Sequence, residues 1–205
     1  MNILRLISAI VVLFFTVNCA VKTPQLNKTQ KISKEEAVSN VRKLTPEFCR
    51  LKSKGVFSYE DRFSKVKFKG TIVKTCKGKL KMNVLGMFGQ VYLEAIYDGN
   101  TLEIMKEGED ISSRYDSFFS EEKVAHLVKL LNVPLLMPDE DFRFDIFANH
   151  YVFSKNDIVI YADADFDIVR IRRGTEAVEY KYGEDKLEML EYNGAEQMFK
   201  MQLYN

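Results

Sequence analysis

The sequence predicts a mainly β protein of the α+β class, in which a curved antiparallel sheet of about eleven strands wraps around one or more helices. Segments with an apolar residue at every second position recur along most of the chain, separated by Asp, Asn and Gly. This alternation is typical of strands that bury one face and leave the other in water. Apolar residues at helical spacing occur in two segments. A sheet of that size rarely stays flat, so we expect it to curl around the helices.

The first residues resemble a lipoprotein signal. Arg5 precedes an apolar run, Leu6 to Val17, which is shorter than the roughly 20 residues that a membrane-spanning helix needs. The run ends in TVNC, which resembles a bacterial lipobox, although Asn18 stands where Gly, Ala or Ser is usual. We therefore expect residues 1–18 to be a cleaved signal peptide and Cys19 to carry the lipid. A signal cleaved without lipidation and an uncleaved short anchor are the alternatives.

The segment after Cys19 has the composition of a linker. Residues 19–33 contain scattered apolar residues without periodicity, which predicts a flexible tether that spans roughly 20 Å root-mean-square. No second linker, internal repeat or low-complexity segment follows. Residues 34–205 are therefore expected to form one domain, long enough to bury a sizeable core.

Two helices are predicted, at Ser33 to Leu44 and at Ser120 to Leu131. Ser33 is a plausible N-cap, and Glu36 stands at the capping-box spacing behind it. The second helix runs into NVPLLMP, where Pro134 and Pro138 prevent a regular continuation. The apolar faces consist of Ala37, Val38, Val41 and Leu44 in the first helix and of Val124, Leu127, Val128 and Leu131 in the second.

The first two strands determine their own register. A turn between Arg62 and Phe63 places Phe57 opposite Phe68, with every apolar residue on the same face as its partner. The same register places Cys49 opposite Cys76. An exported chain meets an oxidising compartment, so we favour a disulfide between them, worth roughly 3 kcal/mol. Two buried free thiols are the alternative.

Further hairpins follow. Lys77-Gly78-Lys79 and Asp98-Gly99-Asn100 are predicted turns. The strands expected after residue 76 are Leu80–Val84, Val91–Tyr97, Leu102–Ile104, Phe142–Ile146, Tyr151–Phe153, Ile158–Ala162, Ile168–Arg172, Ala177–Tyr182, Leu187–Tyr192 and Gln197–Leu203.

The net charge of +1 conceals an asymmetry along the chain. From Cys19 to Met82 there are 17 Lys and Arg against 5 Asp and Glu, and from Asn83 to Asn205 there are 12 against 24. The positive half is suited to an anionic membrane surface or an acidic partner. A solvated strand face would show the same pattern. Nucleic acid is not an expected partner of an exported chain.

Residues with catalytic or metal-binding potential are scarce. His126 lies in the second predicted helix and His150 at a turn, and neither stands at a metal-ligand spacing or beside an obvious nucleophile. Asp163, Asp165 and Asp167 are spaced as at the start of a calcium loop, but the glycine and glutamate of such a loop are missing. We interpret them as a turn between two strands. The sequence therefore predicts no enzyme, no metal and no cofactor.

The order of segments resembles the Lol carrier and receptor family of bacterial lipoprotein sorting, above all its membrane-anchored LolB-like receptors. The resemblance covers most of the chain after Cys19 and includes KLKMNVLGMFGQVYLEAIYDGNTLEI, LLNVPLL and IVIYADADFDIVRIRRG. It implies an incomplete antiparallel barrel with helices across its mouth and an apolar cavity for acyl chains. It also implies a receptor that takes lipoproteins from a periplasmic carrier and inserts them into the outer membrane, which it faces from the periplasmic side. Ala20 favours the outer membrane over the inner one.

The resemblance gives two groups of residues a role. Phe88, with Met87 beside it, matches a loop that projects an apolar residue for membrane insertion, although both could instead pack under the rim of the sheet. The inward face mixes large residues with Gly55 and Gly70, which can leave room for acyl chains, although a solid core would use the same residue types. The expected cavity lining consists of Phe57, Phe68, Ile72, Met82, Val84 and Leu93.

Other functions fit the same sequence. The chain could be a periplasmic lipoprotein of the same fold that binds another lipid or a glycolipid. It could also be a sensor of mislocalised lipoproteins, or a structural subunit of an envelope complex.

Overall fold

The computed structural model describes residues 29–62, 64–114, 121–183 and 186–204. The predicted signal peptide, Cys19 and most of the predicted tether lie outside the described residues. Every helix and strand described below lies between Lys34 and Tyr204. Neither described helix is long and apolar enough to cross a membrane.

The described part of the chain forms one antiparallel sheet of 13 strands. They are β1 (Leu51–Asp61), β2 (Lys65–Lys74), β3 (Leu80–Leu85), β4 (Val91–Tyr97), β5 (Leu102–Lys106), β6 (Glu109–Asp110), β7 (Arg143–Phe147), β8 (His150–Lys155), β9 (Ile158–Ala162), β10 (Ile168–Arg173), β11 (Glu176–Tyr182), β12 (Leu187–Asn193) and β13 (Gln197–Tyr204).

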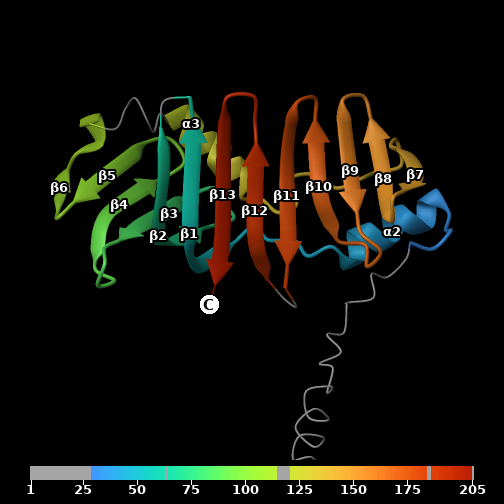
Figure 1. The fold of residues 1–205 in the computed structure, drawn as a ribbon, viewed down its shortest axis with the longest axis horizontal. Coiled ribbons are helices and arrows are strands. Elements are labelled where there is room, and N and C mark those ends of the chain that lie inside the picture. The colour runs from blue at the N-terminus through green and yellow to red at the C-terminus, as the bar shows by residue number, and fades with distance from the viewer. Residues whose placement is uncertain (1–28, 63, 115–120, 184–185, 205) are drawn as a thin grey trace, which may run out of the picture.

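The sheet is open. Its strands are ordered β6-β5-β4-β3-β2-β1-β13-β12-β11-β10-β9-β8-β7, and the described residues of the end strands β6 and β7 do not pair with each other. Figure 1 shows β1 and β8 to β13 standing side by side, whereas β3 to β5 tilt out of line with them as the sheet curls. The predicted incomplete antiparallel barrel is confirmed, with 13 strands in place of about eleven.

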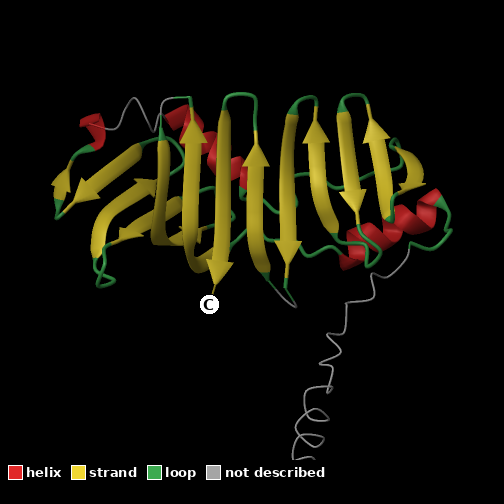
Figure 2. Ribbon diagram, viewed as in Figure 1, coloured by secondary structure: helices red, strands yellow, loops and turns green. Residues whose placement is uncertain are grey.

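Two α-helices, α2 (Lys34–Leu44) and α3 (Glu121–Leu130), lie on one side of the sheet (Figure 2), and a 3-10 turn, η1 (Ser112–Arg114), follows β6. The Ser33 side chain caps α2 by accepting a hydrogen bond from the Glu36 amide at 3.2 Å, as predicted. The predicted apolar face of α2 is wrong at its end, because Leu44 is 49% exposed. The next residue, Thr45, is buried instead and donates a hydrogen bond from Oγ1 to the Phe166 carbonyl at 2.7 Å.

The register of β1 and β2 agrees with the sequence analysis. Phe57 pairs with Phe68, and their rings stack with centroids 5.5 Å apart. Beyond the ends of these strands, a disulfide joins Cys49 to Cys76, with Cα atoms 4.7 Å apart. The hairpin is therefore closed at one end by the chain connection between β1 and β2 and at the other by a covalent bond.

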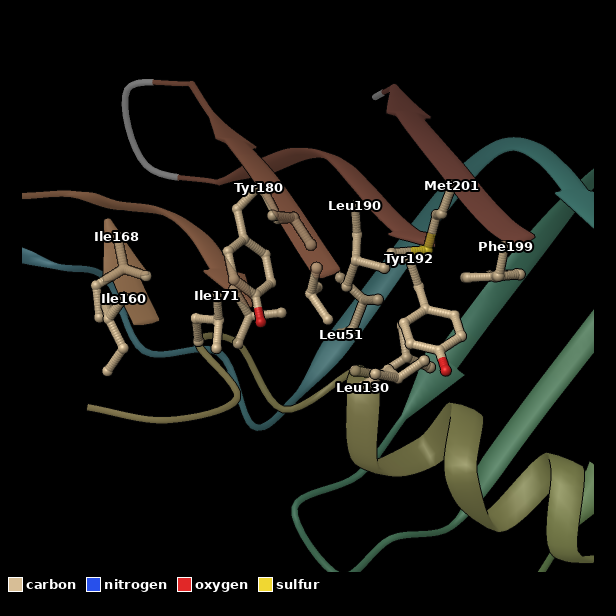
Figure 3. Close-up of a cluster of buried hydrophobic side chains, with 14 of the residues drawn as sticks. Leu51, Leu130, Ile160, Ile168, Ile171, Tyr180, Leu190, Tyr192, Phe199 and Met201 are labelled. Atoms are coloured by element: carbon tan, nitrogen blue, oxygen red, sulfur yellow. The ribbon is translucent and has the colours of Figure 1, made fainter. Parts of the chain in front are cut away.

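The hydrophobic core fills the space between the sheet and the helices. In Figure 3, Leu130 at the end of α3 lies against the sheet near Tyr192, and the layer of side chains continues to Ile160 and Ile168 of β9 and β10. The α2 residues Ala37, Val38 and Val41 are buried in the same cluster. One core thus runs beneath the sheet from α3 to α2.

Lys74 is an unexpected member of the buried face. It is 1% exposed and occupies an inward position of β2, two residues after Ile72. Its Nζ donates hydrogen bonds to the Cys49 carbonyl at 2.8 Å and to Asn132 Oδ1 at 2.7 Å. Burial lowers the pKa of the Lys74 ammonium, because the charged form loses water. These bonds connect the disulfide end of the hairpin to the segment that follows α3.

Candidate functional site

An apolar cavity of about 360 Å³ lies between α3 and the inner face of the sheet. Its floor extends across seven neighbouring strands, from β5 to β12, and α3 forms its roof. This volume is at the low end of the roughly 300–1,000 Å³ of small-molecule sites. The lining residues are Phe57, Ser58, Tyr59, Val66, Phe68, Leu80, Met82, Val84, Tyr92, Leu93, Ala95, Tyr97, Leu102, Ile104, Lys123, Val124, His126, Leu127, Leu130, Tyr192, Gln197 and Phe199.

Most of the predicted lining residues are at the cavity. The structure places Phe57, Phe68, Met82, Val84 and Leu93 in its wall. The prediction is wrong for Ile72, which is fully buried in the core and does not line the cavity.

The contacts of α3 explain the position of Ile72. Lys74, the next inward residue of β2, donates a hydrogen bond to Asn132. Val128 lies near the β2–β3 turn, with its Cγ1 3.8 Å from a Cβ placed on Gly78. The end of α3 and the following residues therefore cover this end of β2, and the space remains open toward Phe68.

Gly70 has a different role from the one expected of it. A Cβ at this position would lie 2.4 Å from the Asn83 carbonyl oxygen of β3, which is a backbone atom that cannot move aside freely. It would also lie 3.4 Å from the rings of Phe57 and Phe68. Gly70 therefore allows β2 and β3 to approach closely, and it is not among the residues that line the cavity. Ala95 of β4 is a small apolar residue in the wall.

The roof of the cavity is one face of α3. Lys123, His126, Leu127 and Leu130 are spaced by three and four residues, so they share a face of the helix, and all of them line the cavity. The His126 ring meets Tyr192 edge-on, with centroids 5.2 Å apart. No binding role was predicted for His126, which stands three residues after Lys123 and four before Leu130 and so shares a face of α3 with them.

The cavity has exposed residues at its margin. Val66 of β2 is 44% exposed and Tyr92 of β4 is 48% exposed, although both line the cavity. Lys106 holds its Nζ 4.7 Å from the centre of the Tyr92 ring. Because adjacent strands are antiparallel, the start of β2 and the start of β4 lie at the same edge of the sheet as the β3–β4 loop.

This loop presents two apolar side chains to solvent. Met87 is 94% exposed and Phe88 is 90% exposed, so the alternative that they pack under the rim is wrong. The loop itself is well ordered by hydrogen bonds. The Gly86 amide donates to the Gln90 carbonyl at 2.9 Å, and the Phe88 amide donates to Gln90 Oε1 at 3.1 Å. This bracing role of Gln90 was not predicted from the sequence.

The structure explains why glycine stands at positions 86 and 89 of this loop. A Cβ on Gly86 would lie 2.6 Å from Gln90 Nε2, so a larger residue here would move the flexible Gln90 side chain out of its bracing position. Gly89 has a φ of +82°, a conformation that L side chains rarely adopt. The chain thus builds a defined turn whose tip carries Met87 and Phe88 outward.

The basic residues near this loop lie on the outer face of the sheet. Lys65 forms an ion pair with Glu60 at 2.6 Å, and Lys81 pairs with Glu94. Lys67 and Lys69 are exposed, and they form no ion pair with the residues that the structure describes. The outer face of β2 therefore retains positive charge at the same edge as the loop.

The other polar candidates lie away from the cavity. His150 of β8 holds its Nδ1 3.0 Å from the Ala148 carbonyl and is not part of the cavity wall. Asp163 Oδ1 accepts hydrogen bonds from the amides of Asp165 and Asp167, each at 3.0 Å, in the turn between β9 and β10. The interpretation as a turn is confirmed. Within the described ranges, no group of three or more His, Cys, Asp and Glu side chains is arranged to hold a metal ion.

The aspartates of this turn have perturbed acidities. Burial raises the pKa of Asp163. Burial, together with the nearby charges of Asp163 and Asp165, raises the pKa of Asp167 to about 6.

Comparisons with known proteins give structural neighbours only. No family model and no curated protein matches the sequence. A LolA superfamily protein from Nitrosomonas europaea has 8% identity and a TM-score of 0.44, over 85% of this chain and 93% of that one. A putative outer membrane lipoprotein-sorting protein domain from Vibrio parahaemolyticus has 10% identity and a TM-score of 0.39, over 83% and 89%. At such low similarity, function has to be inferred from this chain's own cavity and loop.

Proposed function

We propose that this protein is a lipid-anchored receptor that binds the acyl chains of lipoproteins in the cavity beneath α3 and transfers them into a membrane. The observation that carries the proposal is the apolar cavity of about 360 Å³. Its wall is formed mainly by Phe, Leu, Val, Met and Tyr side chains. The chemistry required is binding and release, so the chain is proposed to be a carrier and not an enzyme.

The cavity is suited to an acyl chain for a simple reason. The hydrocarbon part of an acyl chain has no polar group to recognise, and its binding energy comes from removing methylene groups from water, at about 0.8 kcal/mol each. A wall of apolar side chains around open space provides this without a specific contact. A solid core would leave no such space.

The β3–β4 loop is proposed to act at transfer. Burying a side chain the size of Phe or Met contributes a favourable free energy of roughly 1.5–3 kcal/mol. Met87 and Phe88 do not gain this free energy while they are exposed to water. The acyl region of a bilayer would restore it. Lys67 and Lys69 would hold the same edge of the sheet over anionic head groups, at about 1 kcal/mol for each basic residue near the surface.

The anchor is proposed to keep the loop near its membrane. Cys19 would carry the lipid, and a tether of roughly 20 Å would leave the domain within reach of the surface. We place the protein at the outer membrane, facing the periplasm, with a periplasmic carrier as the donor of lipoproteins. The resemblance to the Lol family and Ala20 after the cysteine support this location.

Transfer into liposomes tests this function. The protein is loaded with a fluorescent triacylated lipopeptide and mixed with liposomes, and the rate of transfer is measured for the wild type and for Phe88→Glu. Because Phe88 is 90% exposed, the substitution should leave folding and lipopeptide binding unchanged. Transfer should slow roughly ten- to hundredfold, from the loss of about 1.5–3 kcal/mol of insertion energy.

Phe147→Glu is the matched control. Phe147 is also exposed, at 69%, but it lies on β7 at the far end of the sheet from the loop. Its variant should transfer lipopeptide at the wild-type rate. Equal transfer by Phe88→Glu and the wild type would show that the loop is not the insertion device. A wild type that binds no lipopeptide would contradict the receptor function itself and favour another lipid.

A further inference from the structure

One residue of the cavity wall, His126, has a buried ring nitrogen, Nε2, that has no partner in the described structure. Three buried side-chain polar atoms make no hydrogen bond with the described residues: Asn83 Oδ1, His126 Nε2 and Tyr182 OH. Of these residues, only His126 lines the cavity. A buried polar group without a partner costs roughly 1–3 kcal/mol, so an occupant that supplies a partner for Nε2 gains from doing so.

The position of the His126 ring is set by its neighbours. His126 belongs to the face of α3 that forms the roof, between Lys123 and Leu130. The edge-on contact with Tyr192 holds the ring on the β12 side of the cavity. The strands from β2 to β5 supply mainly apolar side chains to the remaining wall. One flank of the cavity can therefore receive a polar atom while the rest receives hydrocarbon.

The chemistry of acyl ligands indicates which ligand atom would lie beside His126 Nε2. In a fatty acid or an ester, the first polar atom after the hydrocarbon chain is a carbonyl or carboxyl oxygen, and this oxygen accepts hydrogen bonds. An imidazole nitrogen that carries a proton can donate one. The Lys123 side chain lines the same flank of α3, and its positive charge favours an oxygen over a cationic group.

We propose that His126 Nε2 is the polar subsite of the cavity and donates a hydrogen bond to the carboxyl or ester oxygen of a bound acyl ligand. The ligand class is thus narrowed from any apolar molecule to one in which an acyl oxygen adjoins a hydrocarbon chain. This proposal rests on the proposed function, because it requires the cavity to be the acyl site.

Competition against a fluorescent naphthylamine probe tests the subsite. The protein is a chain that begins at Ala20, which contains every described element of the fold. Methyl nonanoate, decanoate and decane displace the probe from the wild type and from His126→Phe and His126→Gln. In the Phe variant, the ester and the acid should bind roughly 2- to 10-fold more weakly, the effect of one lost hydrogen bond. Decane should bind equally well or better.

The Gln variant separates the hydrogen bond from the packing of the ring. Its side-chain amide is a donor that reaches about as far as Nε2, so ester binding should return toward the wild-type affinity. If the ester and decane lose affinity alike in His126→Phe, or if neither loses any, the subsite is refuted although the cavity still binds acyl chains. If no ligand displaces the probe from the wild type, the proposed function fails as well.

A measurement on the wild type does not depend on how the variants fold. The chain has two histidines, so the ring nitrogen resonances of His126 and His150 can be followed by NMR during titration with methyl nonanoate. We expect the His126 Nε2 resonance to move toward the shift of a hydrogen-bonded donor. His150 lies outside the cavity and should not respond. An unchanged His126 resonance at ester saturation would overturn the proposal.

Discussion

Filling the cavity from its wall should abolish acyl binding without harming the fold. Ala95 is the most suitable position. It lines the cavity and lies opposite Met82 of β3 and Ile104 of β5, two larger side chains in the same wall. Ala95→Phe would project a phenyl ring into the open space between them.

The size of the effect follows from the volume. An apolar cavity of about 150 Å³ holds one benzene molecule, so a phenyl group takes up roughly two-fifths of the 360 Å³. If three methylene groups of the ligand lose their place, the cost at about 0.8 kcal/mol each is roughly 2.4 kcal/mol, or about 50-fold in affinity. The fold should tolerate the ring because the space is already open, whereas a packed core would lose about 1–3 kcal/mol.

Two measurements check this prediction. Fluorescence titration with a labelled fatty acid gives the affinity, and urea unfolding gives the stability. Val73→Phe is the control, since Val73 lies on the outer face of β2 and is 37% exposed. It should bind fatty acid as the wild type does. A folded Ala95→Phe protein with wild-type affinity would refute the assignment of the cavity as the acyl site.

Three further predictions concern the rest of the chain. Thiol counting on denatured, unreduced protein should find neither Cys49 nor Cys76 free, and two reactive thiols would contradict the disulfide. Replacing both cysteines with Ala should lower the free energy of unfolding by about 3–4 kcal/mol. Cys19→Ala should leave the chain without attached fatty acid, and label incorporation into this variant would exclude the lipidation site. The raised pKa of Asp167, about 6, means that the native state binds its proton more tightly than the unfolded chain. The stabilising contribution of the protonated carboxyl is therefore complete below about pH 4 and is lost as the pH rises through 6. Because Asn resembles the protonated carboxyl, Asp167→Asn should unfold at a higher urea concentration than the wild type at pH 7. The difference in urea concentration between the two proteins should be smaller at pH 5. An advantage that does not change with pH would contradict this.

The local sequence pattern was sufficient to predict the longer strands, the starts of the two helices and the register between β1 and β2. Alternation places Phe57 and Phe68 on the same face, and one pairing then determines every other pair in the hairpin. The capping of α2 by Ser33 needs only residues three apart. The two-residue strand β6 was missed because a strand that short contains no alternation.

The errors arise where distant segments meet. The burial of Lys74 was not predicted, because its partners, the Cys49 carbonyl and Asn132, stand 25 and 58 residues away in the sequence. Ile72 was assigned to the cavity because the sequence does not show where the end of α3 covers the sheet. Gly70 was interpreted as open space, whereas the structure uses it for close contact with the β3 backbone. The unpaired Nε2 of His126 likewise becomes visible only when the whole wall is assembled.

The most direct test of the acyl-binding claim is to identify what the protein carries. A chain that begins at Ala20 is expressed in a bacterial periplasm, purified without detergent and analysed by native mass spectrometry, followed by extraction of the bound molecules. The account predicts a fraction of the protein with added mass that resolves into acyl lipids or lipopeptides, and a much smaller such fraction in Ala95→Phe. Protein that carries no acyl compound, and that takes up none when incubated with lipopeptide, would contradict it.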